Sequence, residues 1–73
     1  MKQGLLWYER GAEADLESCL VRAVAYFAAK YGHPPACCYI HPDLCPQERT
    51  SASGVRLIPN TRVLKNHFWL EFK

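Results

Sequence analysis

The sequence predicts an α+β fold in which one amphipathic helix packs on one face of a small mixed four-stranded sheet. Apolar residues from Leu16 to Tyr31 recur with the 3.6-residue period of a helix. Gly32 can adopt the left-handed conformation after the last helical residue, and Pro34 and Pro35 prevent the helix from continuing. Segments rich in aromatic and β-branched residues lie before and after this helix, which gives the element order β-α-β-β-β.

The first strand is expected over residues 4–9, which are bulky and aromatic, and Gly11 ends it. The helix then begins between Glu13 and Leu16, and either Gly11 or Asp15 caps it. Its apolar face combines residues spaced by three and four positions: Leu16, Leu20, Ala23, Val24, Phe27 and Tyr31.

The remaining strands follow the two prolines. Residues 37–41 predict a second strand that Pro42 closes, and residues 42–48 predict one turn of helix with Pro42 at its first position. Residues 49–53 are typical of a flexible surface loop. A third strand is expected over residues 55–59 and a fourth over residues 67–73, and the intervening segment is too long for a tight hairpin turn.

This order predicts how the strands pair and which side chains form the core. The helical crossover makes the first two strands parallel through a right-handed connection, and the last two strands should pair antiparallel. In the last strand, Phe68 and Leu70 point to one face while Trp69 points to the other. The expected core consists of Leu6, Leu16, Leu20, Val24, Phe27, Ile40, Val55, Leu57, Phe68 and Leu70.

Length and composition define the class of protein. A chain of 73 residues supports one domain, residues 1–73, with one core. Hydrophobic residues make up 49% of the chain, which excludes disorder by composition. The longest apolar run near the start, residues 5–8, is too short for a signal peptide or a membrane span. We therefore expect a cytoplasmic protein whose four cysteines are reduced thiols, with no cofactor.

Positive charge is concentrated at the end of a chain whose net charge is +2. The last twenty residues carry four basic side chains against Glu71 alone. A basic hairpin can be a nucleic-acid surface or an ordinary solvated edge, and the small total charge favours the second interpretation. The nucleic-acid alternative would use Arg56, Arg62, Lys65 and His67, with Trp69 as a stacking platform.

The cysteines and histidines of residues 37–45 lie closest to a chemical motif. Cys38, His41 and Cys45 have ligand types and a spacing compatible with zinc, which makes them weak candidates for a metal site. Alternation along a strand opposes their convergence, so buried thiols are the simpler interpretation. Cys45 is the best placed nucleophile, because it lies in a turn where it is expected to be exposed near His41, but the negative charge of Asp43 opposes its thiolate. We expect no catalysis.

The aromatic residues suggest a partner surface. They exceed what one helix can cover, so Trp69, with Trp7 or Tyr39, should line the sheet face away from the helix. Glu71 and Lys73 share that face and could set the register across a twofold axis. The function favoured by the sequence is a small non-catalytic interaction module that forms a homodimer or binds a small protein partner.

Overall fold

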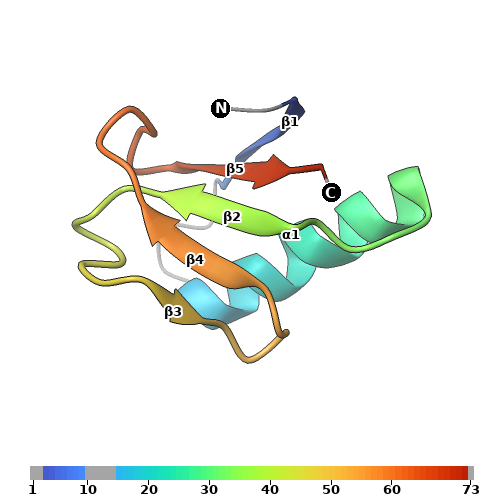
Figure 1. Ribbon diagram of the computed structural model, residues 1–73, viewed down its shortest axis with the longest axis horizontal. Helices are drawn as coiled ribbons and strands as arrows, with labels where there is room; N and C mark the ends of the chain where they lie inside the picture. The colour runs from blue at the N-terminus through green and yellow to red at the C-terminus, as the bar shows by residue number, and fades with distance from the viewer. Residues whose placement is uncertain (1–2, 10–14, 73) are drawn as a thin grey trace.

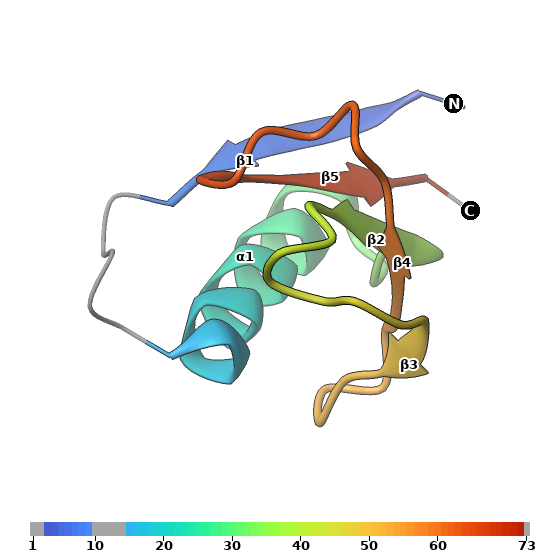
Figure 2. The same ribbon diagram turned by 90° about the vertical axis from the view of Figure 1, so that its left-hand side faces the viewer.

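The computed structural model describes residues 3–9 and 15–72, which form one helix and a mixed five-stranded sheet. The elements, in chain order, are β1 (Gly4–Tyr8), α1 (Leu16–Tyr31), β2 (Cys37–Ile40), β3 (Arg49–Thr50), β4 (Arg56–Pro59) and β5 (His67–Glu71). The strand order across the sheet is β1-β5-β2-β4-β3. Helix α1 lies behind the sheet in Figure 1 and on its left in Figure 2, so the fold has two layers.

Helix α1 begins and ends where local capping is available. Asp15 is the N-cap, and its carboxylate accepts a hydrogen bond of 2.8 Å from the backbone N–H of Ser18. At the other end, Gly32 has a φ of 79° and donates its N–H to the carbonyl of Ala28. These caps confirm the helix and select Asp15 over Gly11 as the residue that begins it.

Strand pairing differs from the expected topology. β1 and β2 run in the same direction, but β5 lies between them and pairs antiparallel with both. β4 pairs parallel with β2, so the expected antiparallel pair of the last two strands is wrong. The long connection over residues 60–66 explains the difference, because it lets the chain cross the end of β2 rather than return beside β4.

Two predictions for the segment between β2 and β4 are also corrected. Residues 49–53 are not a loop throughout, since β3 pairs antiparallel with β4 and the hairpin closes with a Ser51 N–H to Val55 carbonyl bond. Gly54 takes a φ of 85° in this turn, where glycine is favoured. Residues 42–48 form a hydrogen-bonded turn at His41 rather than a turn of helix.

One hydrophobic core lies between α1 and the sheet. Seven of the expected core residues are buried in it: Leu20, Phe27, Ile40, Val55, Leu57, Phe68 and Leu70. Leu16 and Val24 are partly buried against it. Leu6 is a wrong assignment because it is 54% exposed, while its neighbours Leu5 and Trp7 pack against the core. Both faces of β1 are apolar, so alternation alone could not set its phase.

Candidate partner surface

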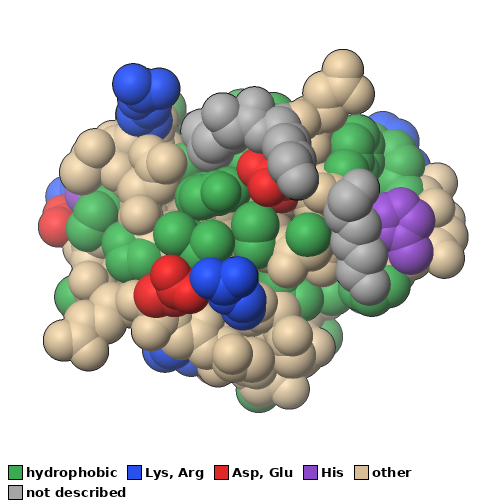
Figure 3. Space-filling view, viewed as in Figure 1, with side chains coloured by type: hydrophobic (Ala, Val, Ile, Leu, Met, Phe, Trp, Pro, Cys, Tyr) green, Lys and Arg blue, Asp and Glu red, His purple; other side chains and the backbone are tan. Residues whose placement is uncertain are grey.

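The sheet face turned away from α1 carries a row of apolar side chains. The strand register places Leu6 of β1 opposite Trp69 of β5, Trp69 opposite Tyr39 of β2, and Tyr39 opposite Ile58 of β4. Since residues in register project to the same face, these four side chains form one row across four strands. We call them the cross-strand row. Figure 3 looks onto this face and shows hydrophobic side chains over its middle.

Trp69 lies on this face because its strand neighbours Phe68 and Leu70 are buried beneath α1. The expected alternation in β5 is therefore present, with Phe72 following Leu70 on the helix side, 5.5 Å from the ring of Phe27. Trp7 is different from the expectation. It packs against the core with its ring 5.4 Å from Tyr26 of α1, which leaves Tyr39 as the aromatic neighbour of Trp69.

The segment of residues 60–66 covers part of the face that was expected to be open. Val63 in this segment is 4% exposed, and a cavity of about 220 Å³ lies between the segment and the sheet. The ring nitrogens Trp69 Nε1 and His67 Nδ1 are buried without a hydrogen-bond partner. The cavity is lined by Leu6, Arg62, Val63, Leu64, His67 and Trp69. The chain therefore covers most of Trp69 itself and leaves the β1 side of the row exposed.

Glu71 is buried rather than exposed, at 7% of its surface, and this corrects its expected place on an accessible face. Its carboxylate lies 3.8 Å from the Sγ of Cys37 on the neighbouring strand. Burial, and then the negative charge of Glu71, raise the pKa of the Cys37 thiol. Lys73, the third expected member of the partner surface, lies outside the described residues.

The basic residues of the C-terminal segment are not gathered into one free patch. Arg56 is paired with Glu48, and the Nζ of Lys65 lies 2.9 Å from a carboxylate oxygen of Asp43. Arg62 is exposed and lines the cavity beside Trp69. His67 lines the same cavity, and its ring lies 4.9 Å from that of Tyr8. Only Arg62 and His67 of the four expected nucleic-acid contacts thus lie beside the aromatic platform.

The thiols and histidines do not converge on a metal site in the described part of the chain. Cys38 and Cys45 both lie in the core, where burial raises the pKa of Cys38 to about 12. His41 lies at the end of β2, and its Nδ1 accepts the backbone N–H of Asp43 at 3.0 Å. Among the described residues, no three side chains of the metal-binding types are grouped.

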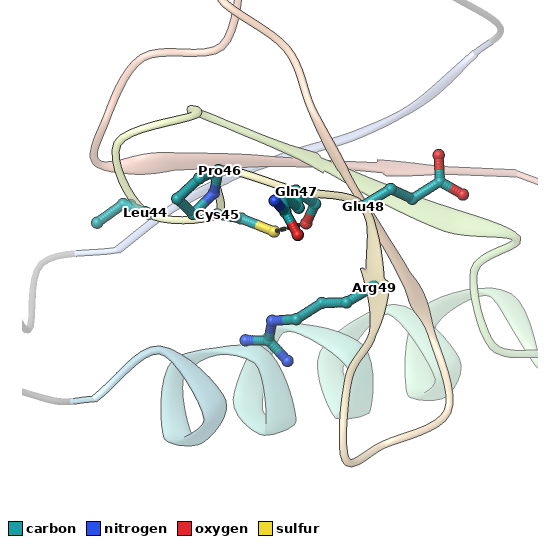
Figure 4. A pocket seen from close by; sticks show the side chains of 6 residues that line it. All are labelled: Leu44, Cys45, Pro46, Gln47, Glu48 and Arg49. Carbon is teal, nitrogen blue, oxygen red and sulfur yellow. Dashed lines mark hydrogen bonds between the residues drawn. The ribbon is translucent and has the colours of Figure 1, made fainter.

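Cys45 was expected to be accessible, but it is 1% exposed. Its Sγ donates to the carbonyl of Gln47 at 3.1 Å, and Figure 4 shows this contact within a cavity of about 390 Å³. Arg49 lines the same cavity and reaches α1, where it pairs with Glu17 at 2.9 Å. A buried thiol bonded to a carbonyl is not a nucleophile prepared for attack.

Comparison with known proteins gives no family for this chain. No family model matches it. Neither the curated proteins nor the solved structures give a significant match. Within residues 3–9 and 15–72, no helix combines the length and the apolar character that crossing a membrane requires. A function for this chain must therefore be inferred from the geometry of the cross-strand row and its surroundings.

Sequence reasoning identified Trp69 and Tyr39 but missed the rest of this surface. Leu6 was assigned to the core, and Ile58 and Leu64 were not considered. The signal for Ile58 was available, because it alternates with the buried Leu57. No signal in the sequence indicated that Leu6 and Trp69 are neighbours, since the insertion of β5 beside β1 is a property of the topology.

Proposed function

We propose that this chain is a small, non-catalytic protein-interaction module that self-associates through the sheet face turned away from α1. The observation that carries the proposal is the cross-strand row of Leu6, Trp69, Tyr39 and Ile58. A sheet with a helix layer on one face leaves its second face to loops, solvent or a partner. Among homo-oligomers, a closed twofold dimer is the commonest arrangement, so a second copy is the partner we favour.

The exposed apolar surface near β1 supports this proposal. Leu6 and Tyr8 of β1 are 54% and 52% exposed, and Leu64 of the covering segment is 68% exposed. Leu6 and Leu64 both line the cavity over Trp69, so they belong to one region of the surface. Aromatic and large apolar residues are enriched where protein interfaces form, and burying them removes apolar area from water.

The test is the oligomeric state of three proteins measured by sedimentation equilibrium over a range of concentrations. The wild type should dimerise, and Trp69→Ala should weaken the dimer by about tenfold or more, as expected for an aromatic anchor. Tyr26→Ala is the matched control, because Tyr26 is a 48% exposed aromatic residue on α1, in the other layer. A wild type that stays monomeric, or a Trp69→Ala dimer as strong as the wild type, would contradict the proposal.

The state of the cysteines supports a reducing, cytoplasm-like compartment as the place where the module works. Cys19, Cys37, Cys38 and Cys45 are all buried, and within the described residues none of them forms a disulfide. Reduced thiols are typical of compartments in which glutathione keeps cysteines reduced. Mass spectrometry of the protein prepared without a reductant should therefore find four thiols per chain, and an intramolecular disulfide would contradict this part of the proposal.

A second candidate is binding of single-stranded nucleic acid to the same face, favoured by Arg62 beside Trp69. Arg62 has no acidic partner among the described residues, whereas Arg56 and Lys65 are neutralised by ion pairs. If this candidate holds, an oligonucleotide should bind with an affinity that falls steeply with salt, and Arg62→Ala should weaken binding more than Arg49→Ala. Absence of binding at low salt would exclude it.

A further inference from the structure

One edge of the sheet, β1, directs part of its backbone groups away from its neighbouring strand. In the described part of the sheet, β1 pairs with β5 on one side and has no strand on the other. The N–H of Phe72 donates to the carbonyl of Gln3, and the N–H of Glu9 donates to the carbonyl of Asn66. Because backbone groups alternate along an antiparallel strand, Gly4 and Leu6 direct their N–H and C=O groups away from β5. These groups can bond to another strand.

The two edges of the sheet differ in their protection. β3, the other edge, has two residues, and Arg49 places a charge on it that is paired with Glu17. β1 has five residues in continuous register with β5, without a bulge, and its sequence GLLWY contains neither a charge nor a proline. Charges, prolines, bulges and short length are the features that prevent strands from pairing between chains. β3 has two of them, and β1 has none.

We infer that a second copy of this chain pairs with β1, strand to strand and antiparallel, and extends the sheet across a twofold axis. This inference rests on the proposed self-association and gives one geometry for it, in which Leu6 of the cross-strand row meets the same residue of the second copy at the sheet edge. The even-numbered residues of β1 direct their backbone groups away from β5, so an antiparallel partner must place even-numbered residues opposite even-numbered ones. The register that uses the full strand centres the axis on Leu6, which then lies opposite the partner's Leu6.

The side chains of β1 are complementary to themselves in this register. Tyr8, which is 52% exposed, lies opposite the partner's Gly4 on the face of the cross-strand row. Gly4 cannot carry a side chain, since a Cβ there would lie 2.4 Å from the carbonyl oxygen of Leu70. An aromatic ring over an edge glycine is a favourable cross-strand pair, because the ring covers the backbone that the glycine leaves bare. On the other face, Leu5 lies opposite the partner's Trp7.

Amide hydrogen exchange followed by NMR tests the inference directly. The amides of Leu5 and Trp7 point to β5, so they should be protected at every concentration. The amide of Leu6 should become protected only as the dimer forms, by about tenfold when dimer outnumbers monomer ten to one. An axis centred on Leu6 also predicts the same behaviour for Gly4. A dimer in which the exchange of Gly4 and Leu6 does not change with concentration would overturn the edge pairing and leave self-association through the face intact.

A cysteine introduced at the axis tests the register. The Cα atoms of a hydrogen-bonded antiparallel pair are about 5.5 Å apart, which is within the span of a disulfide. On non-reducing electrophoresis after mild oxidation, Leu6→Cys should therefore run as a disulfide-linked dimer. Leu64→Cys, at a residue that is 68% exposed, should run mainly as a monomer under the same conditions. Equal cross-linking of the two variants would overturn the inferred axis. A chain that is monomeric at all concentrations would overturn both this inference and the proposed function.

Discussion

Replacing Phe27 by alanine should remove most of the stability of this protein. Phe27 is completely buried at the centre of the core, with its ring 4.8 Å from that of Tyr31 and 5.5 Å from that of Phe72. A Phe→Ala change at such a site costs about 3–5 kcal/mol, from lost burial and from the cavity that remains. At about 0.05–0.15 kcal/mol per residue, a domain of this size has a free energy of unfolding of about 4–11 kcal/mol. The variant should therefore be close to unfolding.

Urea denaturation monitored by circular dichroism at the helix band measures this loss. Tyr26→Ala is the control on the neighbouring position, since Tyr26 is 48% exposed and its ring lies 5.4 Å from that of Trp7. That contact is worth about 0.5–1.5 kcal/mol, so the control should lose much less stability. If Phe27→Ala unfolded at the same urea concentration as the wild type, the assignment of the buried helix face would be wrong.

Three further predictions test the sheet edge, the helix cap and the thiols. Gly4→Ala should lower the urea midpoint, because its Cβ meets the Leu70 carbonyl at 2.4 Å, whereas Arg62→Ala, at an exposed loop position, should not. Hydrogen bonds from Ser18 lower the pKa of Asp15 below its ordinary value of 3.8. This group therefore stabilises the fold above pH 3.8 and loses that contribution as the pH falls through its lower folded pKa, so the stability advantage of wild type over Asp15→Asn should shrink on acidification. Iodoacetamide at pH 8 should modify the folded protein slowly, since all four thiols are buried and burial raises the pKa of Cys38 to about 12. Rapid modification would contradict the burial of the thiols. One zinc ion per chain that is lost in His41→Ala would contradict the absence of a metal site among the described residues.

The helix could be predicted from the sequence because its determinants are local. Asp15, Gly32 and the apolar period from Leu16 act within a few residues of one another, so their pattern survives in a single sequence. The alternation of β5 is equally local and placed Trp69 on the correct face. These two local patterns identify the centre of the candidate surface.

What could not be predicted depends on contacts between distant segments. The insertion of β5 between β1 and β2 decides that Leu6, and not Trp7, lies beside Trp69. Leu5, Leu6 and Trp7 are all apolar, so period-two alternation gives no preferred phase. β3 has only two residues, too few for any periodicity, and its existence follows from the hairpin at Ser51 and Gly54. The burial of Cys45 likewise follows from the turn at His41, which directs it into the core.

The molecular mass in solution tests the central claim most directly. One chain has a mass of 8.4 kDa. Sedimentation equilibrium of the unmodified protein, measured from low to high micromolar concentration, should show a reversible shift towards twice that mass. The same mass of one chain at every concentration would contradict self-association, and with it both the proposed function and the pairing of β1 across a twofold axis.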